Sequence, residues 1–344
     1  MAKVTWAGAR EIAADLAGWP RGRTTGTHTY LAARYLHILT SGRSSSVALA
    51  AARGIPRSPH RATMPLPHLD AQYTRALANL KQDGITFLPH LLDADKIAQI
   101  VDFARTAPAV LADSRRATVR GTYQDRSAAT RSARIIEPFV LDNQLIQSVI
   151  SNTALIAIAE NYFRTRILVH PPQLYWSCAP IAFDAAAPQA QTPEPLQTAE
   201  EFHWDFDGLG GLRLHMYLTD VDTGSAPMKY VKGSHKPGTL RAWRLRNADR
   251  GVQDADVWAR FTADDVLTVT GPAGTTFLSN SNGLHRGTPA TTRDRLFLVM
   301  PFQATSFAGY QLKPRLVTPK DPVFAEMLAN RAPSLNWFRN RDNS

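Results

Sequence analysis

The segment HWDFDGLGGLRLHMYLTDVDTG, residues 203–224, places a histidine and an aspartate one residue apart, ahead of glycines and a strand-like run. Side chains at positions i and i+2 of an extended strand point to the same side. His203 and Asp205 are therefore expected side by side, with Trp204 on the opposite side. A nitrogen ligand and a carboxylate, joined by a second histidine, form the facial triad of non-haem iron oxygenases. Because such pairs also occur by chance, a third ligand is required.

The third ligand has to come from another of the ten histidines in the chain. Most of these lie in a basic N-terminal arm or beside prolines, while His215 falls within the next predicted strand and His235 within the turn-like GSHKPG. His285 stands out because it follows the predicted strand in TTFLSNSNGLHRG. Arg295, ten residues later, opens the apolar run LFLVMPF. An arginine at this position suits a dicarboxylate co-substrate, because its guanidinium pairs with a carboxylate through two parallel hydrogen bonds.

Composition indicates an ordinary globular protein. The chain has 344 residues, of which 44% are apolar, enough for a large core in one or two domains. Residues 1–20 lack the apolar stretch of a signal peptide, and no apolar run is long enough for a membrane span. We therefore expect a cytoplasmic protein with no transmembrane segment. The single cysteine, Cys178, is expected to be a small core residue.

The net charge of +10 is concentrated in the N-terminal arm, where residues 1–66 hold nine basic and two acidic side chains. Two helices are expected in this arm, at residues 7–17 and 28–40, followed by a loop or linker over residues 41–61. The arm is interpreted as a helical extension that packs on the main body; the alternative is attraction to an anionic polymer, a membrane surface or an acidic substrate. Its basic residues are not interleaved with aromatic ones, which argues against nucleic-acid binding.

Regular secondary structure is predicted beyond the arm. Helices are expected at residues 69–82, at 94–105 behind the cap Asp93, and at 145–163, with a short strand in GITFLP. From residue 167 the pattern changes to repeated short strands: ILV, QLYWSC, FHWDFD, LRLHMYL, MKYV, VLTVT, TTFLSN and LFLVMPF. This favours a β-sandwich or barrel over a βαβ fold. The predicted division is an extension over 1–66, a core domain over 67–312, and a tail with a short helix over 313–344.

Several ordered motifs between residues 81 and 311 resemble the Fe(II)- and 2-oxoglutarate-dependent dioxygenases of the phytanoyl-CoA dioxygenase-like family: KQDGITFLPHLLDADKIAQI, ENYF, HWD, YLTDVDTGSAPMKYVKGSHKPG, GPAGTTF and HRGTPATTRDRLFL. The resemblance implies a mainly β fold with flanking helices, built on a double-stranded β-helix (jelly roll, cupin-like). It also implies that His203, Asp205 and His285 bind iron. Arg295 would anchor the distal carboxylate of 2-oxoglutarate, with Arg293 as the reserve candidate. Family members often have a serine where this chain has Gly287.

The implied activity is hydroxylation of an unactivated C–H bond in a small molecule. 2-Oxoglutarate would fill two of the three remaining iron positions and O2 the third, with release of succinate and CO2. Related halogenases lack the ligand carboxylate, so Asp205 favours hydroxylation, while desaturation and ring closure stay open. Two other classes also stay open: a cupin-like metalloenzyme that does not use 2-oxoglutarate, and a non-enzymatic protein that binds nucleic acid or membranes through its basic arm.

Further residues are expected to surround the iron. Arg213 is a candidate contact for the co-substrate or substrate, the alternative being a structural ion pair, and Asp207 is expected to hydrogen-bond a ligand histidine. The substrate pocket is expected to be bordered by the loop at residues 179–199, by RAWRLR at 241–246, and by Gln173, Tyr175 and Trp176. An anionic substrate would suit the arginines, although an exposed basic face is the alternative. Removal of residues 1–66 is expected to preserve 2-oxoglutarate binding, and no oligomeric state is predicted.

Overall fold

The structure is a computed structural model that describes residues 6–18, 25–54, 67–113, 117–181, 200–240, 251–305 and 313–343. The N-terminal arm holds three helices: α1 (Trp6–Gly18), α2 (Thr27–Leu39) and α3 (Arg43–Gly54). The third corrects the prediction of a loop or linker over residues 41–61. Its sequence, RSSSVALAAARG, contains four alanines, at positions 48 and 50–52, and alanine has the highest helix propensity. Residues 55–61 lie outside the described ranges.

Side-chain caps fix where the helices of the body begin. Asp70 and Asp93 each accept a hydrogen bond from a backbone N–H of the first turn of α4 (Ala71–Asp83) and α5 (Ala94–Thr106). The single helix predicted over residues 145–163 is in fact two, α7 (Gln144–Ile150) and α8 (Thr153–Phe163). Asn152 separates them because its side chain accepts hydrogen bonds from the N–H groups of Ala154 and Leu155, which starts a new helix.

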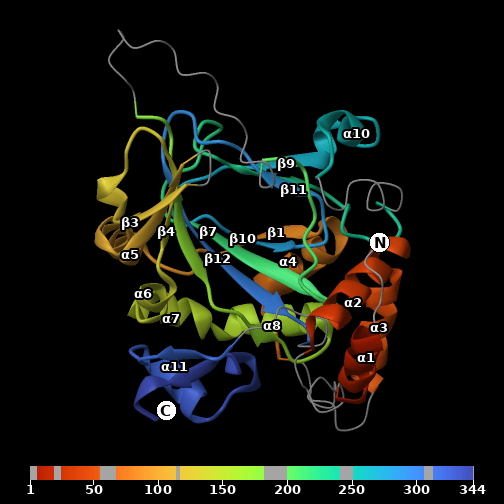
Figure 1. Cartoon of the computed structure of the whole chain (residues 1–344). Coiled ribbons are helices and arrows are strands. Elements are labelled where there is room, and N and C mark those ends of the chain that lie inside the picture. The colour runs from red at the N-terminus through yellow and green to blue at the C-terminus, as the bar shows by residue number, and fades with distance from the viewer. Residues whose placement is uncertain are drawn as a thin grey trace.

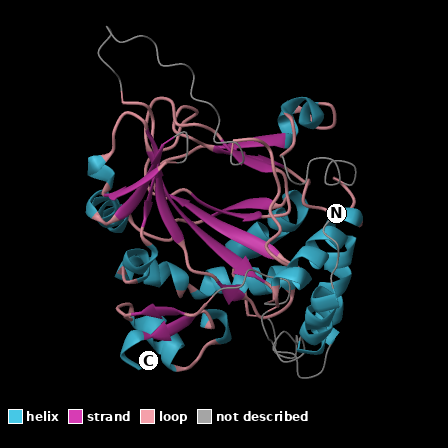
Figure 2. Cartoon of the chain, viewed as in Figure 1, coloured by secondary structure: helices cyan, strands magenta, loops and turns pink. Residues whose placement is uncertain are grey.

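Two antiparallel sheets form the centre of the molecule (Figures 1 and 2). The larger has the order β1-β10-β7-β12-β6-β4-β2-β3, with β5 paired to β12, and the smaller has the order β11-β8-β9. The strands of the larger sheet are β1 (Ile85–Leu88), β2 (Ala109–Asp113), β3 (Thr118–Gly121), β4 (Thr130–Ile135), β5 (Leu168–Val169), β6 (Gln173–Ser177), β7 (Gly211–Tyr217), β10 (Thr276–Asn280) and β12 (Arg295–Gln303). Those of the smaller are β8 (Met228–Val231), β9 (Val266–Val269) and β11 (His285–Gly287).

The path of the chain between these sheets is that of a jelly roll. From β6 it passes to the segment around His203, which pairs with β11 of the smaller sheet, and then returns to β7 of the larger sheet. It continues through β8 and β9 in the smaller sheet, β10 in the larger, β11 in the smaller and β12 in the larger. The predicted mainly β fold with flanking helices is therefore confirmed. The strands β2, β3 and β4 were not predicted.

One face of the larger sheet packs in the hydrophobic core, and the other lines a cavity. On β12, Leu296, Leu298 and Met300 are at most 1% exposed and belong to the main hydrophobic core, which includes side chains of α4, α5 and α8. Arg295, Phe297 and Val299 alternate with them and line a cavity on the other face. The cavity therefore lies on the face of the sheet away from the helices.

Smaller elements complete the described part of the chain. They are α6 (Glu137–Leu141), α10 (Asp254–Trp258), α11 (Pro322–Ala329), the parallel pair β13 (Arg315–Val317) and β14 (Phe338–Asn340), and the 3-10 turns Tyr123–Asp125, Ala263–Asp265, Pro333–Leu335 and Arg341–Asn343. The short helix expected in the C-terminal tail is α11. Among the described helices, none has the length and apolar character needed to cross a membrane.

The arm packs on the back of the segment that carries His203 and Asp205. Ile38 of α2 lies in one hydrophobic cluster with Phe202, Trp204 and Phe206. The Tyr30 hydroxyl donates a hydrogen bond to the carbonyl oxygen of Phe206, at 3.2 Å. Trp204 points away from its neighbours His203 and Asp205, as the alternation predicts, and contacts the arm. The extension is therefore a support for the candidate metal segment.

Because the arm packs on this segment, changes in the arm are expected to affect both the stability of the protein and its metal binding. Ile38→Ala should lower the free energy of unfolding by about 2–5 kcal/mol, the usual cost of a buried large-to-small change, and should weaken metal binding by loosening the Trp204 segment. Urea denaturation and a Ni(II) titration measure the two effects. Leu36→Ala is the control, because Leu36 on the same helix is 51% exposed. Equal metal affinity in both variants would show that the arm does not support the site. A chain lacking residues 1–66 is likewise expected to lose metal affinity.

Candidate metal centre and its cavity

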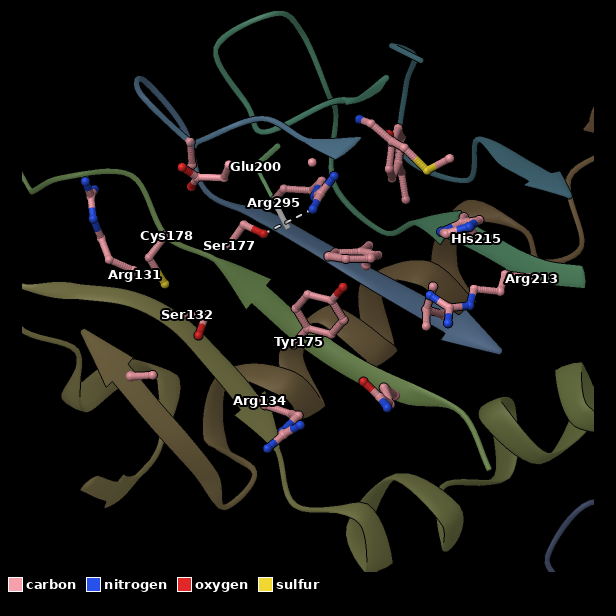
Figure 3. Close-up of a pocket in the computed structure, with 18 of the residues that line it drawn as sticks. Arg131, Ser132, Arg134, Tyr175, Ser177, Cys178, Glu200, Arg213, His215 and Arg295 are labelled. Carbon is pink, nitrogen blue, oxygen red and sulfur yellow. Dashed lines mark hydrogen bonds between the residues drawn. The ribbon is translucent and has the colours of Figure 1, made fainter. Parts of the chain in front are cut away.

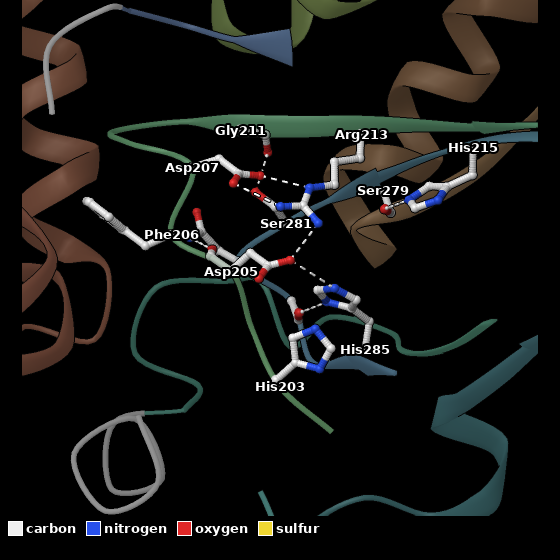
Figure 4. Close-up of polar contacts among 12 residues, drawn as sticks. His203, Asp205, Phe206, Asp207, Gly211, Arg213, His215, Ser279, Ser281 and His285 are labelled. Atoms are coloured by element: carbon white, nitrogen blue, oxygen red, sulfur yellow. Dashed lines mark hydrogen bonds and ion pairs between the residues drawn. The ribbon is translucent and has the colours of Figure 1, made fainter. Parts of the chain in front are cut away.

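Three side chains from two distant parts of the chain meet at one point (Figure 4). His203, Asp205 and His285 each offer one ligand atom, and these atoms all lie within 4.8 Å of one another. The main chains of His203 and His285 form a pair of N–H to carbonyl hydrogen bonds of 2.9 and 2.8 Å. Residues 203–205 form only this isolated bridge and no regular strand, yet the backbone is extended enough to bring both side chains to the same point.

Backbone carbonyl groups fix the protonation of both histidine rings. Nδ1 of His203 lies 2.9 Å from the carbonyl oxygen of Glu201, and Nδ1 of His285 lies 2.9 Å from that of Gly283. Since a carbonyl oxygen can only accept, each Nδ1 carries the proton and each neutral ring keeps its lone pair on Nε2. Nε2 is therefore the atom that binds a metal. The prediction that Asp207 would hold a ligand histidine is wrong, because backbone carbonyl groups perform this role.

Asp207 instead binds Arg213 of β7. Its two carboxylate oxygens accept hydrogen bonds of 3.0 and 2.9 Å from Nε and Nη2 of Arg213, a geometry that occupies one edge of the guanidinium. Nη1 of Arg213 lies 2.7 Å from Oδ2 of Asp205. Arg213 thus has the ion pair considered as the alternative to co-substrate binding. It also lines the cavity, and its contact with a co-substrate stays a prediction.

The Asp205 carboxylate remains ionised despite its burial. Burial alone would raise its pKa, but the Arg213 guanidinium outweighs that effect, and the pKa lies below its usual value. Oδ2 lies 3.2 Å from Nε2 of His285 and makes ion-pair contacts, but it accepts no hydrogen bond from the described residues. A buried carboxylate oxygen that lacks a hydrogen bond and faces two imidazole lone pairs fits a divalent transition metal such as Fe(II).

The neighbouring histidines are neutral because they are buried. Burial lowers the pKa of His203 to about 4. Burial also lowers the pKa of His170 to about 4, and that of His215 well below its usual value. At neutral pH the lone pair of His203 is therefore free for a metal.

These depressed values predict that the metal-free protein loses stability in acid. Between about pH 6.5 and 4 the unfolded chain binds protons on these three histidines that the folded chain does not, so the free energy of unfolding falls as the pH falls. Each histidine contributes up to about 1.4 kcal/mol per pH unit, and we expect a loss of at least about 2 kcal/mol between pH 7 and 5. Urea denaturation in the presence of a chelator measures it. Equal stability at both pH values would mean that these rings are already protonated in the folded state.

Arg295 lies inside the cavity and Arg293 lies outside it. Arg295 is 5% exposed, its Nη2 donates a 3.1 Å hydrogen bond to Oγ of Ser177, and its Cζ lies 3.9 Å from the ring centre of Phe297. Its Nε has no hydrogen-bond partner, and no carboxylate is paired with it among the described residues. The Arg293 side chain is 64% exposed and pairs with Asp222 at 2.9 Å. A buried guanidinium without a carboxylate is costly, and a bound carboxylate would relieve that cost.

The cavity has a volume of about 870 Å³ and connects these groups (Figure 3). Gln173 and Tyr175 line it, as predicted, but Trp176 does not. Trp176 points to the opposite face of β6, into the main core, where its Nε1 donates to the carbonyl oxygen of Ala104. Because side chains alternate along β6, Trp176 faces the core while its neighbour Tyr175 faces the cavity. Of the predicted pocket segment 179–199, residues 179–181 are described and do not line the cavity, while residues 182–199 and the predicted segment 241–246 lie outside the described residues.

Other predictions concerned single residues. Cys178 is buried in the main core, as expected, and His235 is not part of the metal group, its Nε2 lying 3.3 Å from the carbonyl oxygen of Lys81. The sequence reasoning missed several polar residues that line the cavity, among them Arg131, Arg134, His170 and Glu200. The alternation in TRSARI, residues 130–135, with Ala133 and Ile135 buried, was the available signal for the first two.

The chain has weak similarity to several solved structures. The epimerase SnoN in complex with Fe3+, alpha ketoglutarate and nogalamycin RO is 19% identical, with a TM-score of 0.45 over 68% of this chain and 84% of SnoN. HygX from Streptomyces hygroscopicus, with nickel and 2-oxoglutarate bound, is 14% identical, with a TM-score of 0.45 over 72% of this chain and 91% of HygX. EctD from S. alaskensis, with 2-oxoglutarate and 5-hydroxyectoine, is 16% identical, with a TM-score of 0.43 over 71% of this chain and 82% of EctD.

No protein-family model and no curated protein matches the sequence. Membership of the phytanoyl-CoA dioxygenase-like family, which the motifs suggest, is therefore not confirmed by these comparisons. At such low identities and TM-scores, the structural likeness says nothing about the chemistry of this chain. The functional conclusion has to rest on the geometry of its own residues.

Proposed function

We propose that this protein is an Fe(II)- and 2-oxoglutarate-dependent dioxygenase, of the phytanoyl-CoA dioxygenase-like kind, that hydroxylates an unactivated C–H bond of a small molecule. One observation carries the proposal: His203 and His285 of the candidate metal group line the same cavity as the buried guanidinium of Arg295, which has no carboxylate partner among the described residues. The metal group supplies three ligands on one side of an ion, and Arg295 supplies a partner for a carboxylate.

Each of these residues has a defined role in the proposal. The two Nε2 atoms and the Asp205 carboxylate would hold the ion, and 2-oxoglutarate and O2 would be the co-substrates that react there. Arg295 pairs with the distal carboxylate of 2-oxoglutarate, while Ser177 and Phe297 hold the guanidinium in place. Bound iron would activate O2, convert 2-oxoglutarate to succinate and CO2, and deliver oxygen to the substrate. The jelly roll orients the substrate and limits the access of water.

Hydroxylation is the finer part of the proposal. The solved structures similar to this chain include an epimerase and a carbocyclase, by their descriptions, as well as EctD with 5-hydroxyectoine. The Asp205 carboxylate favours hydroxylation over halogenation, because it occupies a metal position that halide would need. A product heavier by one oxygen atom would support hydroxylation, whereas a product lighter by two hydrogens or of unchanged mass would assign desaturation, ring closure or epimerisation.

The proposal is tested with protein loaded anaerobically with Fe(II) and 2-oxoglutarate. On exposure to O2 and a panel of small-molecule metabolites, we expect release of succinate that depends on both Fe(II) and 2-oxoglutarate and is absent from His285→Ala. If the protein binds Fe(II) stoichiometrically but neither binds nor consumes 2-oxoglutarate, it is a metalloenzyme of the co-substrate-independent kind.

A further inference from the structure

The part of the cavity formed by β4 carries arginines that the proposed chemistry does not use. Strand β4 lies between β2 and β6 in the larger sheet, and its residues Ser132 and Arg134 line the cavity (Figure 3). Arg134 is paired with Val110 on β2 and with Tyr175 on β6, and Tyr175 is paired with Phe297 on β12. Directly paired residues share a face of the sheet. Arg134 therefore belongs to the row of side chains that forms the floor of the cavity.

A bulge brings a second arginine of β4 to the same cavity. Ala112 is paired with Ser132, whereas the next residue of β2, Asp113, is paired with Thr130, so Arg131 is an extra residue in its strand. A bulge redirects the side chain of the strand that contains it. In a regular strand, Arg131 and Ser132 would point to opposite faces, but both line the cavity.

Arg131 and Arg134 are the cavity arginines without a partner among the described residues. Arg315 is paired with Glu137, and Arg213 with Asp205 and Asp207. Arg295 is assigned to 2-oxoglutarate in the proposed function. Neither Arg131 nor Arg134 has an ion pair or a side-chain hydrogen bond to any described residue. Glu200 is the remaining carboxylate of the described lining, so this half of the cavity keeps an excess of positive charge.

We propose that Arg131 and Arg134 bind an acidic group of the substrate, a carboxylate or a phosphate, and that the enzyme therefore acts on an organic anion. This inference rests on the proposed function and extends it to a substrate class. Guanidinium groups pair with both kinds of oxyanion through charge-assisted hydrogen bonds. Tyr175 and Phe297, in the same row, offer an apolar surface to the rest of the molecule.

The position of the site also limits the substrate. Arg134 lies two strands away from β12, which at the usual spacing between strands corresponds to about 10 Å from the strand that carries Arg295. The acidic group and the C–H bond presented to the metal therefore belong to a molecule of modest length. A positive wall within a cavity also raises the local concentration of anions.

The test uses full-length protein loaded with Ni(II) and 2-oxoglutarate, so that the metal and Arg295 are already occupied. Benzoate and phenyl phosphate are titrated by calorimetry, with benzamide as the neutral compound of nearly the same shape as benzoate. We expect at least one of the two anions to bind about tenfold more tightly than benzamide. Which of them binds more tightly distinguishes a carboxylate from a phosphate. Equal binding of all three compounds, or displacement of 2-oxoglutarate by the anions, would overturn the proposal.

Variants locate the site and separate this inference from the proposed function. Arg131→Gln and Arg134→Gln should each reduce anion affinity about tenfold, toward that of benzamide, while benzamide binding stays unchanged. Arg75→Gln is the matched control, because Arg75 is exposed on α4 and is not part of the cavity lining. Metal and 2-oxoglutarate content are measured for each protein. Loss of either in the unaltered protein refutes the proposed function, whereas full loading with no effect of the two arginines on anion affinity refutes the anion site alone.

Discussion

Replacing His203, Asp205 or His285 with alanine is expected to weaken metal binding by at least about 100-fold, more than the 10- to 100-fold typical of residues that only support a ligand. Each replacement removes one of three ligands, and the remaining two cannot define one side of the ion. Metal content after anaerobic reconstitution with Fe(II) and dialysis measures the effect, and circular dichroism verifies the fold. The fold should survive, because none of these three side chains belongs to the main hydrophobic core.

A matched control separates a ligand from any histidine of the cavity. His215 lines the same cavity, but its Nε2 lies 3.1 Å from Oγ of Ser279 and its ring stacks on Phe277 at 4.8 Å. His215→Gln should therefore retain stoichiometric metal. Full metal content in the Asp205→Ala and His285→Ala proteins would remove the basis of the proposed function, and loss of metal in His215→Gln would add a ligand to the site.

Replacing Arg295 with alanine should raise the concentration of 2-oxoglutarate needed for half-saturation by at least about tenfold. The loss of one charge-assisted hydrogen bond, about 1.4 kcal/mol or more, accounts for that factor. Arg293→Ala is the control and should change the requirement little, because Arg293 is largely exposed and already paired with Asp222. The charge-transfer absorption of the iron chelate, followed during a titration with 2-oxoglutarate, measures both variants.

The alternative outcomes of this comparison are equally informative. A larger effect of Arg293→Ala would move the anchor to that residue and would require the segment before β12 to turn inward. No effect of either replacement, in protein that still binds iron, would favour the metalloenzyme that does not use 2-oxoglutarate. A loss of iron in Arg295→Ala would indicate that the guanidinium supports the metal ligands and not the co-substrate.

Local features of the sequence determined much of the architecture. The cap Asp93 starts its helix where predicted, because a side-chain oxygen that accepts from the first turn acts over only three residues, whereas the cap Asp70 was not predicted. The same local character explains the pair His203 and Asp205, whose shared side follows from an extended backbone alone. The break at Asn152 and the helix α3 were missed, since a run of apolar or alanine-rich residues does not reveal where one helix stops.

Contacts between distant segments depended on the tertiary structure. The predicted strand before His285 and the motif resemblance indicated it as the third ligand, but only the hydrogen bonds between the main chains of His203 and His285 bring it beside a residue 82 positions earlier. Arg131 reaches the cavity only because β2 and β4 pair with a bulge, which neither strand encodes alone. The pairing of Arg213 with Asp207 and Asp205 likewise became visible only in the tertiary structure.

By itself, therefore, the sequence determined the helices with clear caps, the strands that lead to a jelly roll, and the candidate ligand pair. These depend on dihedral preferences and side-chain periods of a few residues. Only the tertiary structure decided that Arg295 is buried and Arg293 exposed, that Trp176 faces the core, and that α2 covers the back of the metal segment. Burial and pairing of this kind depend on which surfaces meet, and strands far apart in the sequence meet only in the folded chain.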